Sequence, residues 1–427
     1  MIRILECTEP LQIGGMLNRE GENAPNVDAA VAEIIATVRK GGDEALRDYT
    51  RRFDGAALSA LEVTPSEWEA AVRQVDDAFL AILERAKGNI IAFHEKQRRT
   101  GFIMAEQPGV VLGQKIIPLD RVGIYVPGGT ASYPSTVLMD AIPAKIAGVG
   151  EIVMVTPPGK DGSIDPAILA AAKVAGVDRI FKLGGAQAVA ALAYGTESVP
   201  RVDKIVGPGN LYVATAKRMV YGQVDIDMIA GPSEILVIAD ETANPRHVAI
   251  DMLSQAEHDR LAASFLVTTD KELAGQVQQE IARLLPTLSR SEIATHSIET
   301  NGAVVVTDTL QHAVEISNQI APEHLEVCTD DPFALLPAIC HAGSIFLGKY
   351  APEALGDYFA GPNHTLPTSG TARFSSPLSV DDYIKKSSYI YYDKAALEAV
   401  YRDVDTFARR EGLTAHAESV SSRFREE

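Results

Sequence analysis

Cysteine is scarce in this sequence. The 427 residues include three cysteines, Cys7, Cys328 and Cys340, and no two of them form a CxxC pair. This spacing excludes a disulfide framework and a thiolate metal cluster. The chain also lacks an apolar run long enough to span a bilayer, and its first residues lack the hydrophobic core of a signal peptide. We therefore expect a protein of the reducing cytoplasm with no membrane partner.

Positive charge is scarce as well. Lysine and arginine number 39 against 57 aspartates and glutamates, which gives a formal net charge of -18. This acidity argues against nucleic acid or an anionic membrane as the main partner. The remaining composition is that of an ordinary globular protein, and the length predicts two to four domains.

Short apolar strands alternate with helices over most of the chain. The pattern begins after Gly150 and repeats after Pro232. The expected strands are 152–155, 179–183, 204–206, 235–238, 265–267, 303–306, 325–328 and 344–347. Such alternation indicates βαβ units and parallel sheets covered by helices on both faces. The two series predict two similar α/β units in tandem.

The N-terminal part is expected to be mainly helical. Residues 1–20 are expected to form an arm, and residues 26–50 have a helical pattern that pauses at Gly41-Gly42. The sequence TPSE at 64–67 has the form of a capping box, so a long helix to about Lys96 should follow. Residues 109–118 alternate like a strand, and residues 381–427 are charged and mostly helical in pattern.

Glycine-rich turns follow several of the strands: YVPGG at 125–129, GGAQ at 184–187 and GPGN at 207–210. Parallel sheets bind ligands at the carboxyl ends of their strands, glycine lets the backbone approach a ligand, and helix N-termini favour phosphate. Tight turns that require a positive φ also explain each of them. None has the GxGxxG spacing, so the motifs alone do not establish a dinucleotide site.

The sequence SQAEHD at 254–259 closes a predicted helix. Asn244 is a good N-cap, and Pro245 occupies the first helical position. Asp251, Gln255 and His258 follow at spacings of four and three, so they lie along one border of the buried face. This border is either a solvated polar flank or half of a metal site, since zinc takes three or four ligands.

Three further clusters contain residues suited to chemistry. Glu323 and His324 form a candidate acid/base pair in a loop that enters a strand. Asp357 lies in a polar, glycine-rich loop at 356–364 and could complete a metal shell. Glu411 and His416 lie near the C-terminus, where a histidine is usually only solvated.

Cys328 follows His324 by four residues, so both side chains would face the same side of a strand. The thiol could act as a nucleophile toward an aldehyde. A small buried hydrophobe between Val327 and Thr329 is the preferred interpretation.

Taken in order, these motifs resemble the L-histidinol dehydrogenase family over essentially the whole chain. The segments that carry the resemblance are DRVGIYVPGG at 120–129, GGAQ at 184–187, GPGN at 207–210, IAGPSE at 229–234, SQAEHD at 254–259, APEHL at 321–325, GDYFAGPNH at 356–364, FSSPL at 374–378 and LTAH at 413–416. Each segment is modest alone, but the set in this order is highly specific.

The resemblance implies oxidation of L-histidinol to L-histidine through L-histidinaldehyde with two NAD+ in succession, the last steps of histidine biosynthesis. It also implies a homodimer with shared active sites and one Zn2+ per subunit. The implied zinc positions are Gln255, His258, Asp357 and His416, with His416 given by the partner subunit. Two imidazoles and two oxygens suit zinc, and they also suit manganese or cobalt.

The resemblance further implies roles for residues outside the metal shell. Glu323 and His324 match the acid/base pair, and Ser233 and Glu411 match substrate-binding positions. The metal and acid/base residues are also implied to contact the substrate. The implied NAD positions are Tyr125, Gln187 and Asn210. Thr130 departs from the lysine expected in many relatives, which could adjust cofactor affinity.

The implied fold is α/β, with two Rossmann-like parallel-sheet domains in tandem, an N-terminal arm and a mostly helical C-terminal tail domain. We expect the arm at 1–20 and a first α/β domain at 21–125 plus 233–380, which holds the metal and acid/base residues. A second Rossmann-like domain at 126–232 is expected on the NAD side. The tail domain at 381–427 is expected to contribute to the partner subunit.

Two alternatives remain at this point. One is a paralogous NAD-dependent dehydrogenase of another polar alcohol, such as a sulfonated diol, although Glu411 and all four ligand positions argue against it. The other is a zinc hydrolase in which Glu323 acts as the base on a metal-bound water. Formation of NADH with histidinol separates the three hypotheses.

Overall fold

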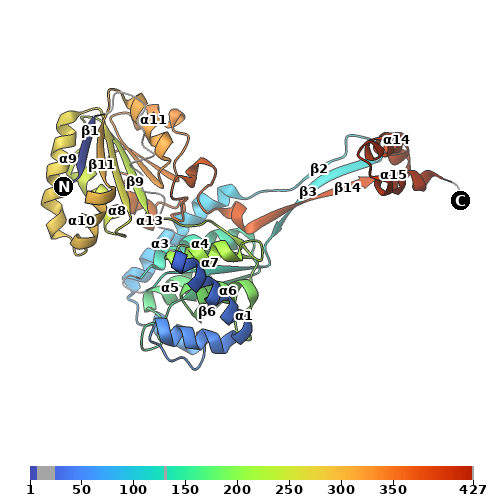
Figure 1. The fold of residues 1–427 in the computed structure, drawn as a ribbon, viewed down its shortest axis with the longest axis horizontal. Helices are drawn as coiled ribbons and strands as arrows, with labels where there is room; N and C mark the ends of the chain where they lie inside the picture. The colour runs from blue at the N-terminus through green and yellow to red at the C-terminus, as the bar shows by residue number, and fades with distance from the viewer. Residues whose placement is uncertain (7–24, 129–131, 426–427) are drawn as a thin grey trace. The chain divides into compact units, whose positions relative to one another are not determined.

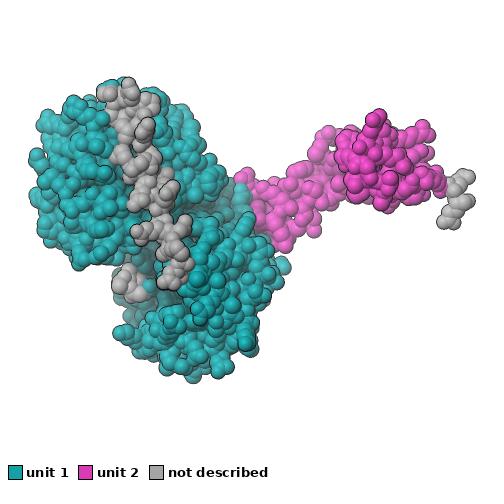
Figure 2. Space-filling model, in the orientation of Figure 1, with its two compact units in different colours: residues 1–97, 119–383 teal, residues 98–118, 384–427 magenta. Residues whose placement is uncertain are grey.

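The computed structural model spans the 427-residue chain and describes residues 1–6, 25–128 and 132–425. The chain divides into two compact units, which are coloured separately in Figure 2. Unit 1 contains Met1–Gln97 and Leu119–Tyr383, and unit 2 contains Arg98–Pro118 and Ile384–Glu427. Unit 1 holds two parallel sheets, and unit 2 holds an antiparallel sheet. Thr130 and the expected arm beyond Glu6 lie outside the described residues.

The five-stranded sheet of unit 1 is parallel throughout and has the strand order β6-β5-β4-β7-β8. Numbered along the chain, this is the 3-2-1-4-5 order of Rossmann-type sheets. Its strands are β4 (Arg121–Tyr125), β5 (Glu151–Thr156), β6 (Arg179–Lys182), β7 (Lys204–Val206) and β8 (Asp225–Ile226). The helices that accompany it are α1 (Pro25–Phe53), α2 (Pro65–Val72), α3 (Asp77–His94), α4 (Pro134–Ala147), α5 (Pro166–Ala175), α6 (Gly185–Tyr194) and α7 (Leu211–Val220).

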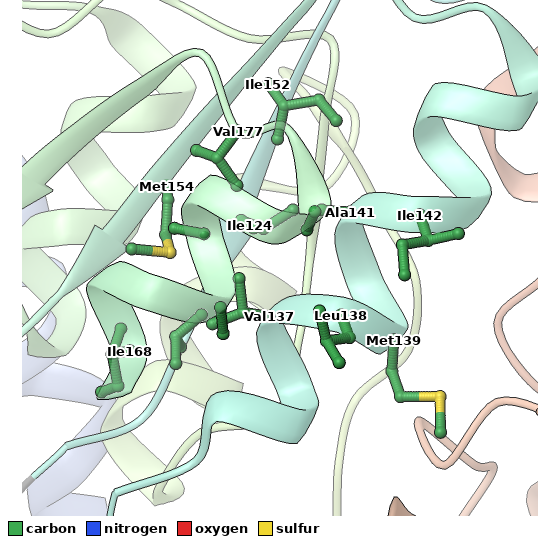
Figure 3. Packing of buried hydrophobic residues seen from close by; sticks show 14 of the residues in the cluster. Ile124, Val137, Leu138, Met139, Ala141, Ile142, Ile152, Met154, Ile168 and Val177 are labelled. Carbon is green, nitrogen blue, oxygen red and sulfur yellow. The ribbon is translucent and has the colours of Figure 1, made fainter. Parts of the chain in front are cut away.

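Alternate residues of these strands face opposite helical layers. In β5, Ile152 and Met154 pack with α3, α4 and α5, whereas Val153 and Val155 pack with α1, α6 and α7. Figure 3 shows the first of these clusters, which contains Ile152 and Met154 of β5 and Val137 of α4. The four β5 residues are 0% exposed, as a parallel sheet covered on both faces requires.

The helices of residues 25–94 cover the five-stranded sheet. Val31, Ile34 and Val38 of α1 belong to the cluster formed with α6 and α7. The expected grouping of residues 21–125 with 233–380 therefore differs from the structure, which also pairs β4 with β5 and β7. Hydrophobic periodicity predicts that α1 is amphipathic, but the sheet that receives its apolar face is decided by long-range packing.

Two local predictions in this region are confirmed and one is wrong. α1 leaves helical geometry at Gly42, where φ is 51° and ψ is -135°, within the predicted pause. Thr64 forms the capping box at the start of α2. The expected long helix is instead divided, because Asp76 accepts a hydrogen bond from Phe79 N at 2.8 Å and caps the new helix α3.

The six-stranded sheet of unit 1 has the order β1-β11-β10-β9-β12-β13 and is also parallel. Its strands are β1 (Arg3–Glu6), β9 (Glu234–Ala239), β10 (Ala263–Thr268), β11 (Ala303–Val306), β12 (His324–Cys328) and β13 (Ser344–Leu347). Strands β9 to β13 repeat the 3-2-1-4-5 order, which confirms two similar α/β units. The expected arm is corrected at Arg3–Glu6, since these residues pair with β11 and lengthen the sheet.

Helices cover both faces of this sheet too (Figure 1). Ile235 and Val237 of β9 pack with α8, while Leu236 and Ile238 pack with α11. The helices of this region are α8 (Pro245–Ala256), α9 (Lys271–Leu284), α10 (Ser291–Asn301), α11 (Leu310–Ile320), α12 (Pro332–Leu335) and α13 (Glu353–Tyr358). Single 3₁₀ turns in unit 1 are η2 (Glu95–Gln97), η3 (Leu285–Thr287), η4 (Leu336–Ala338), η5 (Thr371–Arg373) and η6 (Val380–Tyr383).

Unit 2 is built on an antiparallel sheet with the order β14-β3-β2. Its elements are β2 (Phe102–Met104), β3 (Val110–Pro118), β14 (Ile384–Tyr392), α14 (Lys394–Arg410), α15 (Thr414–Ser421) and η7 (Ser422–Phe424). The predicted strand at 109–118 is confirmed as β3. The expected tail domain at 381–427 is helical only after β14, whose nine residues pair with β3 and so join residues 98–118 to this unit. Among the described residues, no helix is long and apolar enough to cross a membrane.

Candidate active site

The candidate acid/base pair lies where β12 begins. Glu323 is 7% exposed and His324 is 4% exposed. β12 runs beside β9, so both residues meet Glu234 at the start of β9. The main-chain N of Glu234 donates to Glu323 Oε2 at 2.9 Å, and its main-chain O lies 3.2 Å from His324 Nδ1. One peptide residue of the neighbouring strand therefore orients both side chains.

His324 Nε2 is the ring nitrogen that Glu234 does not contact. It is buried and has no hydrogen-bond partner among the described residues. Its nearest acidic atoms are Glu353 Oε1 at 3.9 Å and Asp357 Oδ1 at 3.8 Å. In the tautomer with the proton on Nδ1, the ring donates to Glu234 O, because a carbonyl oxygen can only accept. The neutral ring in this tautomer presents an Nε2 lone pair, which can accept a proton from a bound molecule.

Buried carboxyl groups dominate the electrostatics around His324. Burial opposes protonation of His324, but Glu353, Glu323 and Asp357 outweigh it and raise the pKa of the imidazole. Burial raises the pKa of Glu323 to about 7 and that of Glu353 to about 8. Burial also acts to raise the pKa of Asp357, but its interaction with His324 outweighs burial and lowers it. Such a concentration of acid favours a bound cation.

Gln255 reaches the same cluster from α8, which begins at Pro245 with Asn244 as its N-cap, as predicted. The Gln255 side chain is buried. In one orientation of the amide, its nitrogen lies 2.6 Å from Glu353 Oε1, 2.8 Å from Glu353 Oε2 and 3.3 Å from His324 Nδ1. With Glu353 ionised, the opposite orientation would set the amide oxygen against acceptors only, so hydrogen bonding to the carboxylate favours the first orientation.

Asp357 comes from α13, and the expected irregular loop at 356–364 is corrected at its start, where this short helix lies. Glu353 and Asp357 are four residues apart, so one face of α13 presents both carboxyls. His364 Nδ1 lies 3.0 Å from the main-chain O of Asp357, and His364 Nε2 lies 3.3 Å from Thr136 Oγ1 of α4. The loop after α13 is thereby tied to the helical layer of the five-stranded sheet.

His258 lies just beyond the end of α8, and its main-chain N donates to Gln255 O at 3.1 Å. His258 is exposed. Desolvation by the surrounding groups lowers its pKa, although Asp357 acts in the opposite direction. A neutral imidazole is the form that binds a metal. His258 thus interacts electrostatically with Asp357 and meets the protonation requirement of a ligand.

The position of this site on its sheet was not expected. Ser233 directly precedes β9, and Glu323 and His324 lie at the start of β12. The residues therefore gather at the amino ends of the strands, whereas the general rule for parallel sheets places ligands at the carboxyl ends. Here the loops before β9 and β12, together with α13, supply the side chains, so strand direction does not decide the site.

The NAD positions implied by the family resemblance lie at the carboxyl ends of the five-stranded sheet. Tyr125 ends β4, and its hydroxyl accepts a hydrogen bond from Gly185 N at 2.9 Å. Burial raises the pKa of Tyr125 to about 12. Gln187 lies in the first turn of α6 and is buried, and its Oε1 has no hydrogen-bond partner among the described residues.

Asn210 has a structural role in the same region. It caps α7, because its Oδ1 accepts from Tyr212 N at 3.0 Å and from Val213 N at 3.2 Å. The preceding turn requires glycine at Gly207, where φ is 106° and a Cβ would lie 2.2 Å from Tyr125 O. This turn thus needs a positive φ and also presents a helix N-terminus at the carboxyl end of β7.

Glu411 and His416 belong to unit 2, whereas the other predicted site residues belong to unit 1. Glu411 is the C-cap of α14, His416 lies in α15, and both are exposed. With the apolar side chains of Val404, Phe407 and Leu413 they line a cavity of about 510 Å³. The cavity lies in unit 2 and the His324 cluster in unit 1, so the pairing of the two stays a prediction.

A family model described as histidinol dehydrogenase matches residues 17–424. The chain belongs to the histidinol dehydrogenase family. It is 59% identical to the histidinol dehydrogenase of Syntrophotalea carbinolica over 96% of each chain, and 56% identical to that of Clostridium acetobutylicum over 95% of this chain and 94% of the relative. The crystal structure of histidinol dehydrogenase from Elizabethkingia anophelis matches with a TM-score of 0.92 at 38% identity, over 99% of this chain and 98% of that one.

Membership of the histidinol dehydrogenase family makes the chain an oxidoreductase, and the cluster around His324 fits a metal ion. His324, Glu353 and Asp357 offer ligand atoms that lie within 4.8 Å of one another. Gln255 reaches the same cluster, and the unpartnered Nε2 of His324 faces it. An ionised carboxylate, an amide oxygen and a neutral imidazole of His258 suit zinc.

The carboxyl ends of the five-stranded sheet likewise offer groups that suit a dinucleotide. Gln187 Oε1 is a buried acceptor that lacks a partner, and α6 and α7 direct their N-termini to the strand ends. An unpaired buried acceptor and helix N-termini suit the amide, hydroxyl and phosphate groups of NAD.

Glu353 and Glu234 were missed by the sequence reasoning. A carboxylate four residues before Asp357 could have been noticed, but only after a helix at Glu353–Tyr358 had been predicted. The role of Glu234 rests on its main-chain atoms and on the register of β9 with β12, for which the sequence carries no signal.

Cys328 is 7% exposed and packs in the hydrophobic cluster beneath α8. Burial raises the pKa of its thiol. A thiol that resists ionisation is a poor nucleophile, so the structure agrees with the buried hydrophobe and not with a nucleophile for an aldehyde.

Proposed function

We propose that this chain is a zinc-dependent NAD+ oxidoreductase that carries L-histidinol through L-histidinaldehyde to L-histidine, with two NAD+ consumed per molecule. The proposal places it at the last steps of histidine biosynthesis in the cytoplasm. The observation that carries it is the family match over residues 17–424, which includes every element that forms the His324 cluster.

His324 is proposed to take the proton of the substrate alcohol. Its Nε2 is buried and has no partner among the described residues, and its Nδ1 is fixed by Glu234 O. A ring whose orientation is fixed by this contact needs no rotation before the transfer, which keeps the barrier low. When bound, NAD+ supplies the hydride acceptor and zinc holds and orients the substrate.

Glu323 is proposed to activate the water needed at the aldehyde stage. Burial raises its pKa to about 7, so it can hold or release a proton near neutral pH. Its Oε2 is held by Glu234 N at 2.9 Å and lies 3.7 Å from His324 Nδ1. In this proposal His324 accepts the proton of the alcohol, and Glu323 activates the water.

Gln255, His258 and Asp357 are proposed to hold the zinc ion together with His416 of the partner subunit. Ser233 and Glu411 are proposed substrate contacts, and Tyr125, Gln187 and Asn210 are proposed NAD contacts. The position of His416 in unit 2 and its exposure support a role across a homodimer, because the side chain is available to a second chain.

Two other functions compete with this one. A dehydrogenase of another polar alcohol would share the fold and both cofactors, and a zinc hydrolase would use Glu323 without NAD. Identities of 59% and 56% to proteins named histidinol dehydrogenase favour histidinol over another alcohol. The unpartnered buried acceptor of Gln187 favours NAD over hydrolysis.

The test is the stoichiometry of NADH. Limiting L-histidinol with excess NAD+ should give two NADH per histidinol, and little free histidinaldehyde should accumulate. Absorbance at completion measures the ratio. One NADH per alcohol with accumulating aldehyde would contradict the two-step proposal, and no NADH at all would favour the hydrolase.

A further inference from the structure

Glu353 has an unexplained position in the active-site cluster. It is 3% exposed, and a carboxyl group buried this deeply needs hydrogen bonds to be tolerated. The hydrogen bonds described for its side-chain oxygens come from the amide nitrogen of Gln255, at 2.6 and 2.8 Å. His324 Nε2, at 3.9 Å, lies beyond hydrogen-bond distance.

The direction of the Glu353 side chain is set by the start of α13. Glu353 is the first residue of this helix, and its main-chain N donates to Glu326 Oε1 at 2.8 Å. Glu326 is 1% exposed and belongs to β12, so the start of α13 is anchored to the sheet. A carboxyl on this anchored helix terminus is therefore placed to hold the Gln255 amide.

The orientation of the Gln255 amide must be fixed because its two ends differ chemically. The oxygen of Gln255 can bind a metal, but its NH2 group cannot. Rotation by 180° about the last side-chain bond exchanges the two ends with almost no change in shape. The contact with both oxygens of Glu353 holds the NH2 end, so the carbonyl end must point away from Glu353.

We propose that Glu353 is a positioning residue that holds the NH2 end of Gln255 and thereby presents the carbonyl oxygen to the metal. The inference rests on the proposed function, in which Gln255 is a zinc ligand. It does not require Glu353 to touch the metal or the substrate. Partners that orient a metal ligand are typically responsible for about 10- to 100-fold in metal affinity.

The decisive variant is Glu353→Met, which keeps the length and volume of the side chain but removes both oxygens. The zinc dissociation constant of the purified full-length protein, measured by chelator competition, should rise by about 10- to 100-fold. Glu353→Gln should largely rescue affinity, because its amide oxygen can still accept from Gln255. Glu326→Gln is the matched control: it removes a buried carboxyl from the same layer, keeps an acceptor for Glu353 N, and should leave zinc affinity unchanged.

A double-variant cycle separates positioning from a general structural role. In a Gln255→Met background, Glu353→Met should weaken zinc binding little further, because the oriented oxygen is already absent. An equal loss in both backgrounds would overturn the proposal, as would wild-type zinc affinity in Glu353→Met. Thermal unfolding of the metal-free proteins checks folding, and Glu353→Leu, which also lacks both oxygens, replaces Glu353→Met in the cycle if Glu353→Met does not fold.

The outcomes distinguish this proposal from the function on which it rests. A wild-type protein that binds zinc but forms no NADH with histidinol would overturn the proposed function alone. Unchanged zinc affinity in the Glu353→Met variant of an active enzyme would overturn the positioning role alone. A wild-type protein that binds no zinc would overturn both.

Discussion

The two parallel sheets of unit 1 share a strand order but place their candidate sites at opposite ends. In the five-stranded sheet, Tyr125, Gln187 and Asn210 lie at or just beyond the carboxyl ends of strands. In the six-stranded sheet, Ser233, Glu323 and His324 lie at the amino ends. Topology alone therefore does not decide where chemistry occurs, even between two sheets of one chain.

The two ends differ in the groups that they offer. The carboxyl ends of the five-stranded sheet offer helix N-termini and glycine turns, which suit phosphate. The amino ends of the six-stranded sheet offer buried acids that belong to different elements, Glu323 before β12 and Glu353 on α13. Buried acids suit a cation and proton transfer. The comparison predicts that variants at the two sheets change different measurable quantities.

The largest effect is expected at the amino ends of the six-stranded sheet. His324→Ala removes the proposed base and should lower the rate of histidinol oxidation by about 10²- to 10⁴-fold. Glu323→Gln should mainly slow oxidation of supplied histidinaldehyde. Stopped-flow measurement of NADH with each substrate separates the two steps.

Cys328→Ala serves as the control for these variants, because the thiol is buried among apolar residues and should be dispensable. A folded but inactive Cys328→Ala enzyme would favour a thiohemiacetal route and contradict the assignment of the acid/base pair.

The second prediction asks whether unit 2 completes the site of another chain. His258→Ala and His416→Ala subunits should each be inactive alone, but mixed dimers contain one intact site. If half of the dimers are mixed, roughly a quarter of wild-type activity should return, because two-fold dimers carry two equivalent sites. Activity no higher than that of the separate variants, with mixed dimers confirmed by mass, would show that His416 serves its own chain.

The third prediction concerns the carboxyl ends of the five-stranded sheet. Gln187→Ala removes a buried acceptor and should raise the KM for NAD+ about tenfold, the equivalent of ~1.4 kcal/mol, with zinc affinity unchanged. Asn210→Ala should additionally lower the free energy of unfolding by about 1 kcal/mol, because it loses the cap of α7. A change in zinc affinity in either variant would contradict the assignment of NAD binding and metal binding to different sheets.

The smallest expected effect concerns Glu326, a buried acid of the six-stranded sheet, and the pH dependence of protein stability. Burial, with Asp251 nearby, raises the pKa of Glu326, and burial raises the pKa of Asp251 to about 6. The folded protein therefore holds protons that the unfolded chain releases above the ordinary glutamate pKa of 4.5. The free energy of unfolding must then fall as pH rises through these raised values.

Glu326→Gln removes this dependence and keeps the acceptor for Glu353 N. Between pH 5 and pH 8 its Tm should fall less than that of the wild type, by about 2 °C in calorimetry. A variant that loses as much Tm as the wild type would show that Glu326 is not a source of the pH dependence.

Short-range signals in the sequence predicted much of the fold. Asn244 caps α8, Thr64 forms its capping box, and the pause in α1 lies at Gly42. Caps and periodicity depend on residues within one or two turns, so they are visible in the sequence. The adjacency of Glu323 and His324 is likewise written in the sequence, and their common burial follows from the start of β12.

Tertiary structure decided what depends on contacts between distant segments. β1 joins β11, β14 joins β3, and α1 covers the five-stranded sheet, although none of these partners is near in sequence. The same reason explains the site. Glu234 orients the candidate acid/base pair only through the register of β9 with β12, and Glu353 meets Gln255 only because α13 is anchored to β12 through Glu326. Many sequences share such local patterns, but long-range packing selects one set of neighbours, and that set determines the chemistry of the site.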